Sequence, residues 1–167
     1  MKVLMVVAQK DFRDEEFFEP RDVLIKNGVD VKVASQKRGL ARGRLGGTVM
    51  PDLTIDEAEA GDFAAIVLVG GRGAEVYLDD ERIHRLVKDF HGAGKIVAAI
   101  CLAPMILARA GLLSGVKATC TPDEEQNLVA GGAEYTGTAV EVDGKIVTGS
   151  GPEAARKFGE KIVELLK

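Results

Sequence analysis

The chain has 167 residues, of which 46% are hydrophobic and 29% charged, and its formal net charge is −4. This length and composition predict one folded domain, residues 1–167, and argue against intrinsic disorder. The interspersed, net negative charge argues against a nucleic-acid partner, and no apolar run approaches the roughly 20 residues that would span a membrane.

Short β-branched runs alternate with longer helical patterns, which predicts an α/β fold with a mostly parallel central sheet covered on both faces. Asn27-Gly28 marks a helix end, and Asp143-Gly144 between two β-branched runs predicts a hairpin. A second strand pair is expected near residues 38–52. The predicted strands are Lys2–Ala8, Asp30–Ala34, Ala64–Val69, Ile96–Ile100 and Ile146–Thr148. The predicted helices are Glu15–Asn27, Asp80–His91, Ala103–Ala110, Asp123–Ala130 and Glu153–Leu166.

Three segments of chemical interest follow predicted strands directly. The first strand leads into Gln9–Glu19, the third into Gly70–Gly73, and the fourth ends at Cys101. Ligands of open α/β sheets bind at the carboxyl ends of the strands, so we expect these segments to converge.

Cys101 lies between an apolar strand and a helical segment that has Pro104 near its start. This pattern is typical of a nucleophile elbow, with Cys in place of Ser. The positive end of the helix dipole would lower the thiol pKa there. A small buried hydrophobic residue at a strand end is the alternative interpretation.

Gly70-Gly71 at the exit of a strand would let backbone N–H groups approach a substrate closely, as an oxyanion site requires. An ordinary tight turn would use the same residues. The glycine spacing does not match a dinucleotide-binding fingerprint.

Four carboxylates, Asp14, Glu15, Glu16 and Glu19, crowd the start of the first predicted helix. Most of them would simply complement the helix dipole. A partly buried Glu facing a thiol would instead have a raised pKa and could move a proton. Helical periodicity leaves Glu15 and Glu16 equally open for this role.

The two histidines, His84 and His91, lie among charged residues of one predicted helix and are expected at the surface. A His/Cys metal site would need more ligands than this chain offers, so no metal is predicted.

Motifs along nearly the whole chain resemble the ThiJ/PfpI superfamily. The resemblance implies a flavodoxin-like three-layer sandwich and a homodimer, with hexamers in the archaeal protease branch. The matching segments are Lys2-Val3-Leu4, Phe12–Pro20 with Leu24, Leu68–Arg72, Ala98–Pro104, Gly131-Gly132-Ala133 and Val142-Asp143-Gly144.

The resemblance also implies a site. The family's acid lies four residues before a proline, which here selects Glu16 ahead of Pro20, and in relatives this acid hydrogen-bonds the elbow cysteine. The corresponding oxyanion donors would be the backbone N–H groups of Gly71 and Leu102. No cofactor is implied.

The chain departs from the family pattern at three positions. Protease-like members place His directly after the cysteine, where this chain has Leu102, whose side chain would narrow or dry the pocket. Another branch has His at the position of Thr121 and Arg at the position of Ser150. A thiol protease needs an imidazole as its general base, so Leu102 in place of that histidine disfavours an intracellular cysteine peptidase.

The resemblance therefore implies a stress-response enzyme of glyoxalase or deglycase type, acting on small reactive carbonyls with Cys101 as nucleophile and Glu16 as proton shuttle. The alternative is a redox-sensing or chaperone-like protein without turnover, in which an oxidant reacts with Cys101.

Two cysteines cannot build a disulfide framework, which favours a reducing cytoplasm. Cys120 is expected to be structural, with a role as resolving thiol for Cys101 as the alternative. Scarce Asn and Gln are typical of thermophile proteins, although a GC-rich genome would give a similar composition.

Overall fold

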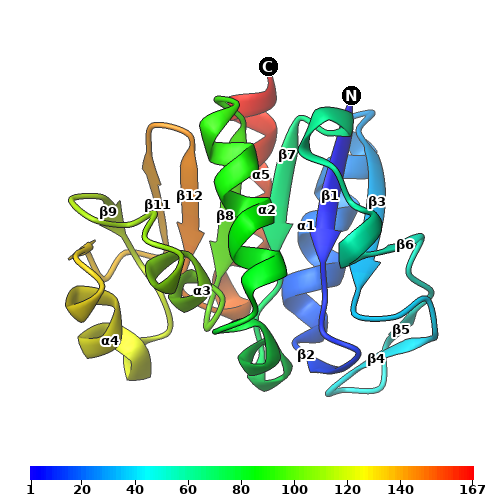
Figure 1. The fold of residues 1–167 in the computed structure, drawn as a ribbon, viewed down its shortest axis with the longest axis horizontal. Coiled ribbons are helices and arrows are strands. Elements are labelled where there is room, and N and C mark those ends of the chain that lie inside the picture. The colour runs from blue at the N-terminus through cyan, green and yellow to red at the C-terminus, as the bar shows by residue number, and fades with distance from the viewer.

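The computed structural model describes residues 1–167 and has a seven-stranded central sheet (Figure 1). The strand order is β11-β12-β8-β7-β1-β3-β6, and every neighbouring pair is parallel except the hairpin of β11 and β12. This confirms the predicted fold class. The strands are β1 (Lys2–Val6), β3 (Asp30–Ser35), β6 (Leu53–Thr54), β7 (Ala65–Leu68), β8 (Ile96–Ile100), β11 (Val140–Asp143) and β12 (Ile146–Gly149).

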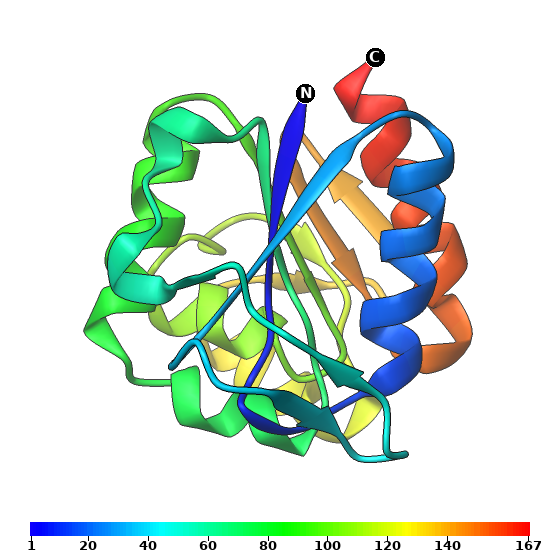
Figure 2. The same ribbon diagram turned by 90° about the vertical axis from the view of Figure 1, so that its right-hand side faces the viewer.

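Helices cover the sheet on both faces, so the central strands are apolar throughout rather than alternating. Figure 2 shows α1 and α5 on one side of the sheet and α2 with α3 on the other. Within β1, Val3 and Met5 pack toward α1 and α5, whereas Leu4 and Val6 pack toward α2 and α3. The helices are α1 (Asp14–Lys26), α2 (Glu81–Gly92), α3 (Pro104–Arg109), α4 (Glu125–Ala130) and α5 (Ala155–Leu166).

Two small sheets flank the central sheet, one after the carboxyl end of β1 and the other beside the edge strand β11. One has the order β2 (Lys10–Phe12), β4 (Ala41–Gly43), β5 (Thr48–Val49), and the other pairs β9 (Lys117–Ala118) with β10 (Glu134–Tyr135). The buried Asp14 carboxylate at the start of α1 accepts hydrogen bonds from the N–H groups of Leu45 (2.7 Å) and Gly47 (2.8 Å). Asp14 thereby fixes the turn between β4 and β5 against α1.

The predicted elements differ from the structure mainly at their ends. The helices predicted from Asp123 and Glu153 begin later, at Glu125 and Ala155, because a 3₁₀ turn with Pro at its first position precedes each of them. The expected strand pair near residues 38–52 is present as β4 and β5. None of the helices combines the length and apolarity that a membrane-spanning helix needs.

Candidate functional site

Three neighbouring strands, β8, β7 and β1, bring the expected segments together at their carboxyl ends. Gly70, which follows β7, lies at the meeting point. A Cβ atom added there would contact Glu16 Oε1 and would lie 2.9 Å from the Cβ of Cys101. Only glycine therefore leaves room for the acid and the thiol to lie side by side.

Cys101 occupies a strained turn directly after β8. Its φ angle is +65°, in the left-handed region that non-glycine residues rarely adopt. Two hydrogen bonds hold it there: its N–H donates to the Gly149 carbonyl (2.8 Å), and its carbonyl accepts from the Thr121 N–H (3.0 Å). The side chain is half-buried, and α3 begins at Pro104. This is the backbone geometry of a nucleophile elbow.

Glu16 lies on the first turns of α1 and is completely buried. Its nearest polar groups are the Cys101 thiol and the Gly70 N–H, yet neither carboxyl oxygen has a hydrogen bond of normal geometry. The nearby Arg13 forms no hydrogen bond with it, because its Nε and one Nη donate to Glu15, at 3.0 and 2.9 Å. Glu16 is thus a buried acid without a dedicated partner, which is typical of a functional group rather than a structural one.

The electrostatics of the pair follow from this burial. Desolvation raises the pKa of Glu16 to about 7. Burial, together with the adjacent Glu16 carboxylate, raises the pKa of Cys101 to about 12. The expectation of a lowered thiol pKa is therefore wrong, because burial and the adjacent Glu16 carboxylate both favour the protonated thiol. A reactive thiolate requires that the thiol proton move to Glu16.

Two hydrogen-bond donors lie beside the Cys101 sulfur. The Gly71 N–H and the Thr121 hydroxyl both act on the sulfur and oppose the rise of its pKa. The N–H groups of Gly71 and Leu102 donate to no other backbone group. Gly71 adopts φ +96°, and a Cβ there would lie 2.5 Å from the Arg13 nitrogen, so the close approach requires glycine.

The other sequence candidates lie outside this arrangement. Glu19 is exposed, and Glu15 is bound to Arg13. His84 is half-buried rather than fully exposed, and its Nε2 is 2.8 Å from the Leu78 carbonyl, whereas His91 is exposed. No group of three or more His, Cys, Asp or Glu side chains is placed to hold a metal ion.

The side chains of two residues near the thiol, Thr121 and Leu102, depart from the family pattern. Thr121 contributes its hydroxyl beside the sulfur and its N–H to the Cys101 carbonyl. The Leu102 side chain packs toward the core under α2 and α3, whereas Cys101 packs toward the core under α1 and α5. A sequence pattern carries no signal for these directions, since they depend on how the turn after β8 is bent.

Cys120 lies in a different environment from Cys101. It is completely buried in the core under α2 and α3, and its thiol donates to the Thr121 carbonyl at 3.2 Å. Its complete burial and its hydrogen bond to the backbone favour a structural role for Cys120 over that of a resolving thiol.

Comparison with known proteins places this site in a family context. The model of the DJ-1/PfpI family matches residues 1–165. The chain is 36% identical to a protein named deglycase from Pyrococcus horikoshii, over the full length of both chains. It is 26% identical to a protein named glutathione-independent glyoxalase from Caenorhabditis elegans, covering 98% of this chain and 88% of that protein. The crystal structure of a ThiJ/PfpI domain protein from Brachyspira murdochii superposes with a TM-score of 0.97 at 36% identity, covering 99% and 95% of the two chains.

Proposed function

The chain belongs to the DJ-1/PfpI family, and from that membership we propose that it is an enzyme of the deglycase or glyoxalase type acting on small reactive carbonyl compounds. The observation that carries the proposal is the pair of Cys101 and Glu16: a half-buried thiol on a strained turn beside a buried acid without a dedicated partner. The names of the relatives from Pyrococcus horikoshii and Caenorhabditis elegans support the substrate class.

The proposed chemistry begins with addition of the thiol to an aldehyde. The ionised Glu16 carboxylate takes the proton of the Cys101 thiol as the sulfur forms a bond to the carbonyl carbon. The electron pair of the carbonyl double bond moves to oxygen, where the N–H groups of Gly71 and Leu102 would stabilise it. Return of the proton from Glu16 to that oxygen gives a hemithioacetal, so atoms and charge balance without a cofactor.

An intracellular peptidase remains disfavoured on this site. Both histidines lie on α2, across the sheet from α1 and Glu16, and the ring of His84 is already bonded to the Leu78 carbonyl. No imidazole is therefore available to the thiol within the chain, and Glu16 is the single group of suitable pKa beside it.

The proposal is tested by methylglyoxal consumption, measured at room temperature and at elevated temperature. We expect the Cys101→Ala variant to lose all turnover and Glu16→Gln to lose on the order of a hundredfold or more, since each removes one partner of the proton transfer. Glu19→Gln is the matched control, because Glu19 is an exposed carboxylate on the same helix, and it should retain full activity.

Turnover that persists in Cys101→Ala would rule out the assignment. Absence of turnover in the unaltered chain would move the proposal to a redox-sensing protein, the alternative that the half-exposed Cys101 and the buried Cys120 favour.

A further inference from the structure

Two neighbouring cavities lie where β1 and β3 end and β2 begins. Their volumes are about 290 and 270 Å³, and Gln9 and Lys10 line both of them. The carboxyl edge of a parallel sheet is where ligands of this architecture bind. The first cavity is lined by Ala8, Gln9, Lys10, Gln36, Lys37 and Val76, and the second by Gln9, Lys10, Asp11, Leu40 and Arg42.

The lining of the two cavities carries a net positive charge, whereas the whole molecule carries a net negative charge. The two cavities are lined by three cationic side chains, Lys10, Lys37 and Arg42, and by one carboxylate, Asp11. None of the three cations forms an ion pair within the chain. By contrast, the adjacent Arg38 is already paired with Glu57. An unneutralised excess of two positive charges thus lines this surface of a protein whose net charge is −4.

The register of the small sheet places two of these cations against each other. Lys10 on β2 lies directly opposite Arg42 on β4. Like charges at opposed positions of neighbouring strands repel and destabilise the pairing. Neither cation forms an ion pair with Asp11, the one carboxylate of the lining, so an anion bound between the two side chains would reduce this repulsion.

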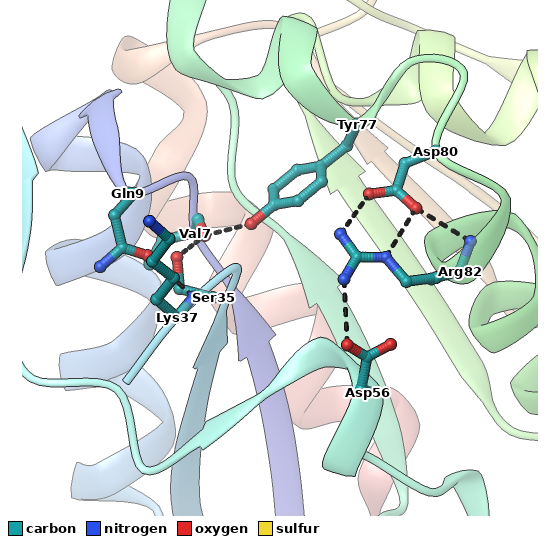
Figure 3. Close-up of polar contacts among 8 residues, drawn as sticks. All are labelled: Val7, Gln9, Ser35, Lys37, Asp56, Tyr77, Asp80 and Arg82. Carbon is teal, nitrogen blue, oxygen red and sulfur yellow. Dashed lines mark hydrogen bonds and ion pairs between the residues drawn. The ribbon is translucent and has the colours of Figure 1, made fainter. Parts of the chain in front are cut away.

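The wall behind the cations is rigid and its polar groups are already satisfied. The Gln9 side chain donates to the Gly39 carbonyl and accepts from the Lys37 N–H, which fastens the segment after β3 to the end of β1. Figure 3 shows that the Tyr77 and Ser35 hydroxyls both point at the Val7 carbonyl, each at 2.7 Å. The backbone that positions Lys10 and Lys37 is thus fixed in advance, which reduces the entropic cost of binding.

We propose that these cavities form a binding site for the phosphate group of a small phosphorylated molecule. A phosphate monoester is close to a dianion at neutral pH, which matches the excess of two positive charges, and Arg42 can bind two of its oxygens at once. A ligand with one carboxylate group has a single negative charge and would leave one of the two excess positive charges unmatched. The site is separate from Cys101 and does not rest on the proposed carbonyl chemistry.

The test is calorimetric titration of the full chain at low ionic strength with glycerol 3-phosphate, inorganic phosphate and glycerol. We expect saturable binding of both phosphates and none of glycerol; tighter binding of the ester than of free phosphate identifies a phosphorylated metabolite as the ligand. Lys10→Gln and Arg42→Gln should each weaken binding about tenfold or more. Lys145→Gln is the matched control, since Lys145 is exposed and lies in the β11–β12 turn at the opposite edge of the sheet.

A second measurement separates a lost site from a damaged fold. Because Lys10 and Arg42 repel each other, Lys10→Gln should leave the melting temperature without ligand unchanged or raise it, while abolishing the increase that phosphate produces in the unaltered chain. The proposal fails if neither phosphate binds, if both variants bind as the unaltered chain does, or if Lys145→Gln loses binding equally.

Discussion

At the scale of single residues, the protonation of one buried acid governs the reactive thiol. Glu16 has a pKa raised to about 7 and Cys101 a pKa raised to about 12, both chiefly because of burial. Near neutral pH the thiol keeps its proton, and Glu16 is close to the midpoint of its titration. A group in that state is well matched to accept and return a proton during turnover.

This ordering of the two pKa values predicts the pH dependence of methylglyoxal turnover. Glu16 must be ionised to act as base, so kcat/KM should rise with pH through about 7. No decline should follow in the mildly alkaline range, because the thiol titrates only near 12. The measurement is kcat/KM between about pH 5 and pH 10, the range in which an acid and a base of this kind are resolved.

The Glu16→Gln variant supplies the control for this profile, since its residual activity should lose the step near 7. A rate that instead falls between pH 6 and 8 would mean that Glu16 acts in its protonated form, contrary to the proposed chemistry.

Part of the candidate site could be read from sequence at this scale. The apolar run ending at Cys101 predicted the strand end, and the family spacing to Pro20 selected Glu16. Periodicity alone could not separate Glu15 from Glu16, because which of the two faces Cys101 depends on how α1 is turned about its own axis. The direction of the Cys101 pKa shift was predicted wrongly. The sequence does not show how far the folded turn buries this side chain, or that Glu16 lies beside it.

At the scale of elements, one carboxylate ties the hairpin of β4 and β5 to the helix that carries Glu16. Asp14 is buried, and it satisfies two N–H groups of the intervening turn. Glycine at positions 43 and 47 is required, because a Cβ at either would lie 2.5 to 2.6 Å from atoms of the Asp14 carboxylate. The hairpin and the start of α1 therefore form one packed unit.

Replacing Asp14 by Ala should lower the free energy of unfolding by about 2 kcal/mol, because hydrogen bonds to charged groups contribute roughly 1.5–3 kcal/mol. Asp22→Ala is the matched control: Asp22 is exposed on the same helix, so its loss should change stability by less than about 0.5 kcal/mol. The measurement is the urea midpoint at constant m-value. Equal effects of the two substitutions would show that the two hydrogen bonds contribute nothing specific.

The elements that the sequence did not predict are those created by distant partners. β2 is three residues long, contains a single apolar side chain, and has a residue at φ +60°, Asp11, that interrupts its pairing. It is a strand only because β4 lies beside it. The strands β7 and β8, by contrast, are apolar on both faces and could be recognised from composition alone.

At the scale of the whole molecule, the two thiols differ in burial and in the core against which they pack, although Thr121, the neighbour of Cys120, bonds the Cys101 carbonyl. Cys101 contacts the core under α1 and α5 and is half-buried, whereas Cys120 is completely buried in the core under α2 and α3. Access of a solute should therefore distinguish them, even though both thiols have a pKa raised to about 12.

Mild peroxide should oxidise Cys101 while leaving Cys120 unmodified, as read by mass mapping of the peptides that contain each residue. Mapping is needed because Met1 and Met50 are exposed and will also gain oxygen. The same reaction in denaturant is the control, and there both cysteines should react alike. Equal oxidation of the two cysteines in the folded protein would show that burial does not protect Cys120.

Because β7 lies between β8 and β1, Glu16 and Cys101 come together only when all three strands have paired. Glu16 follows β1 early in the sequence, and Cys101 ends β8 much later. Parallel pairing of such distant segments closes long loops and forms slowly during folding. Until β1, β7 and β8 have paired, Glu16 and Cys101 have no fixed relation to each other. The environment of the Cys101 thiol is therefore a product of long-range strand pairing, and its reaction rate with a small thiol reagent should report the assembly of these three strands.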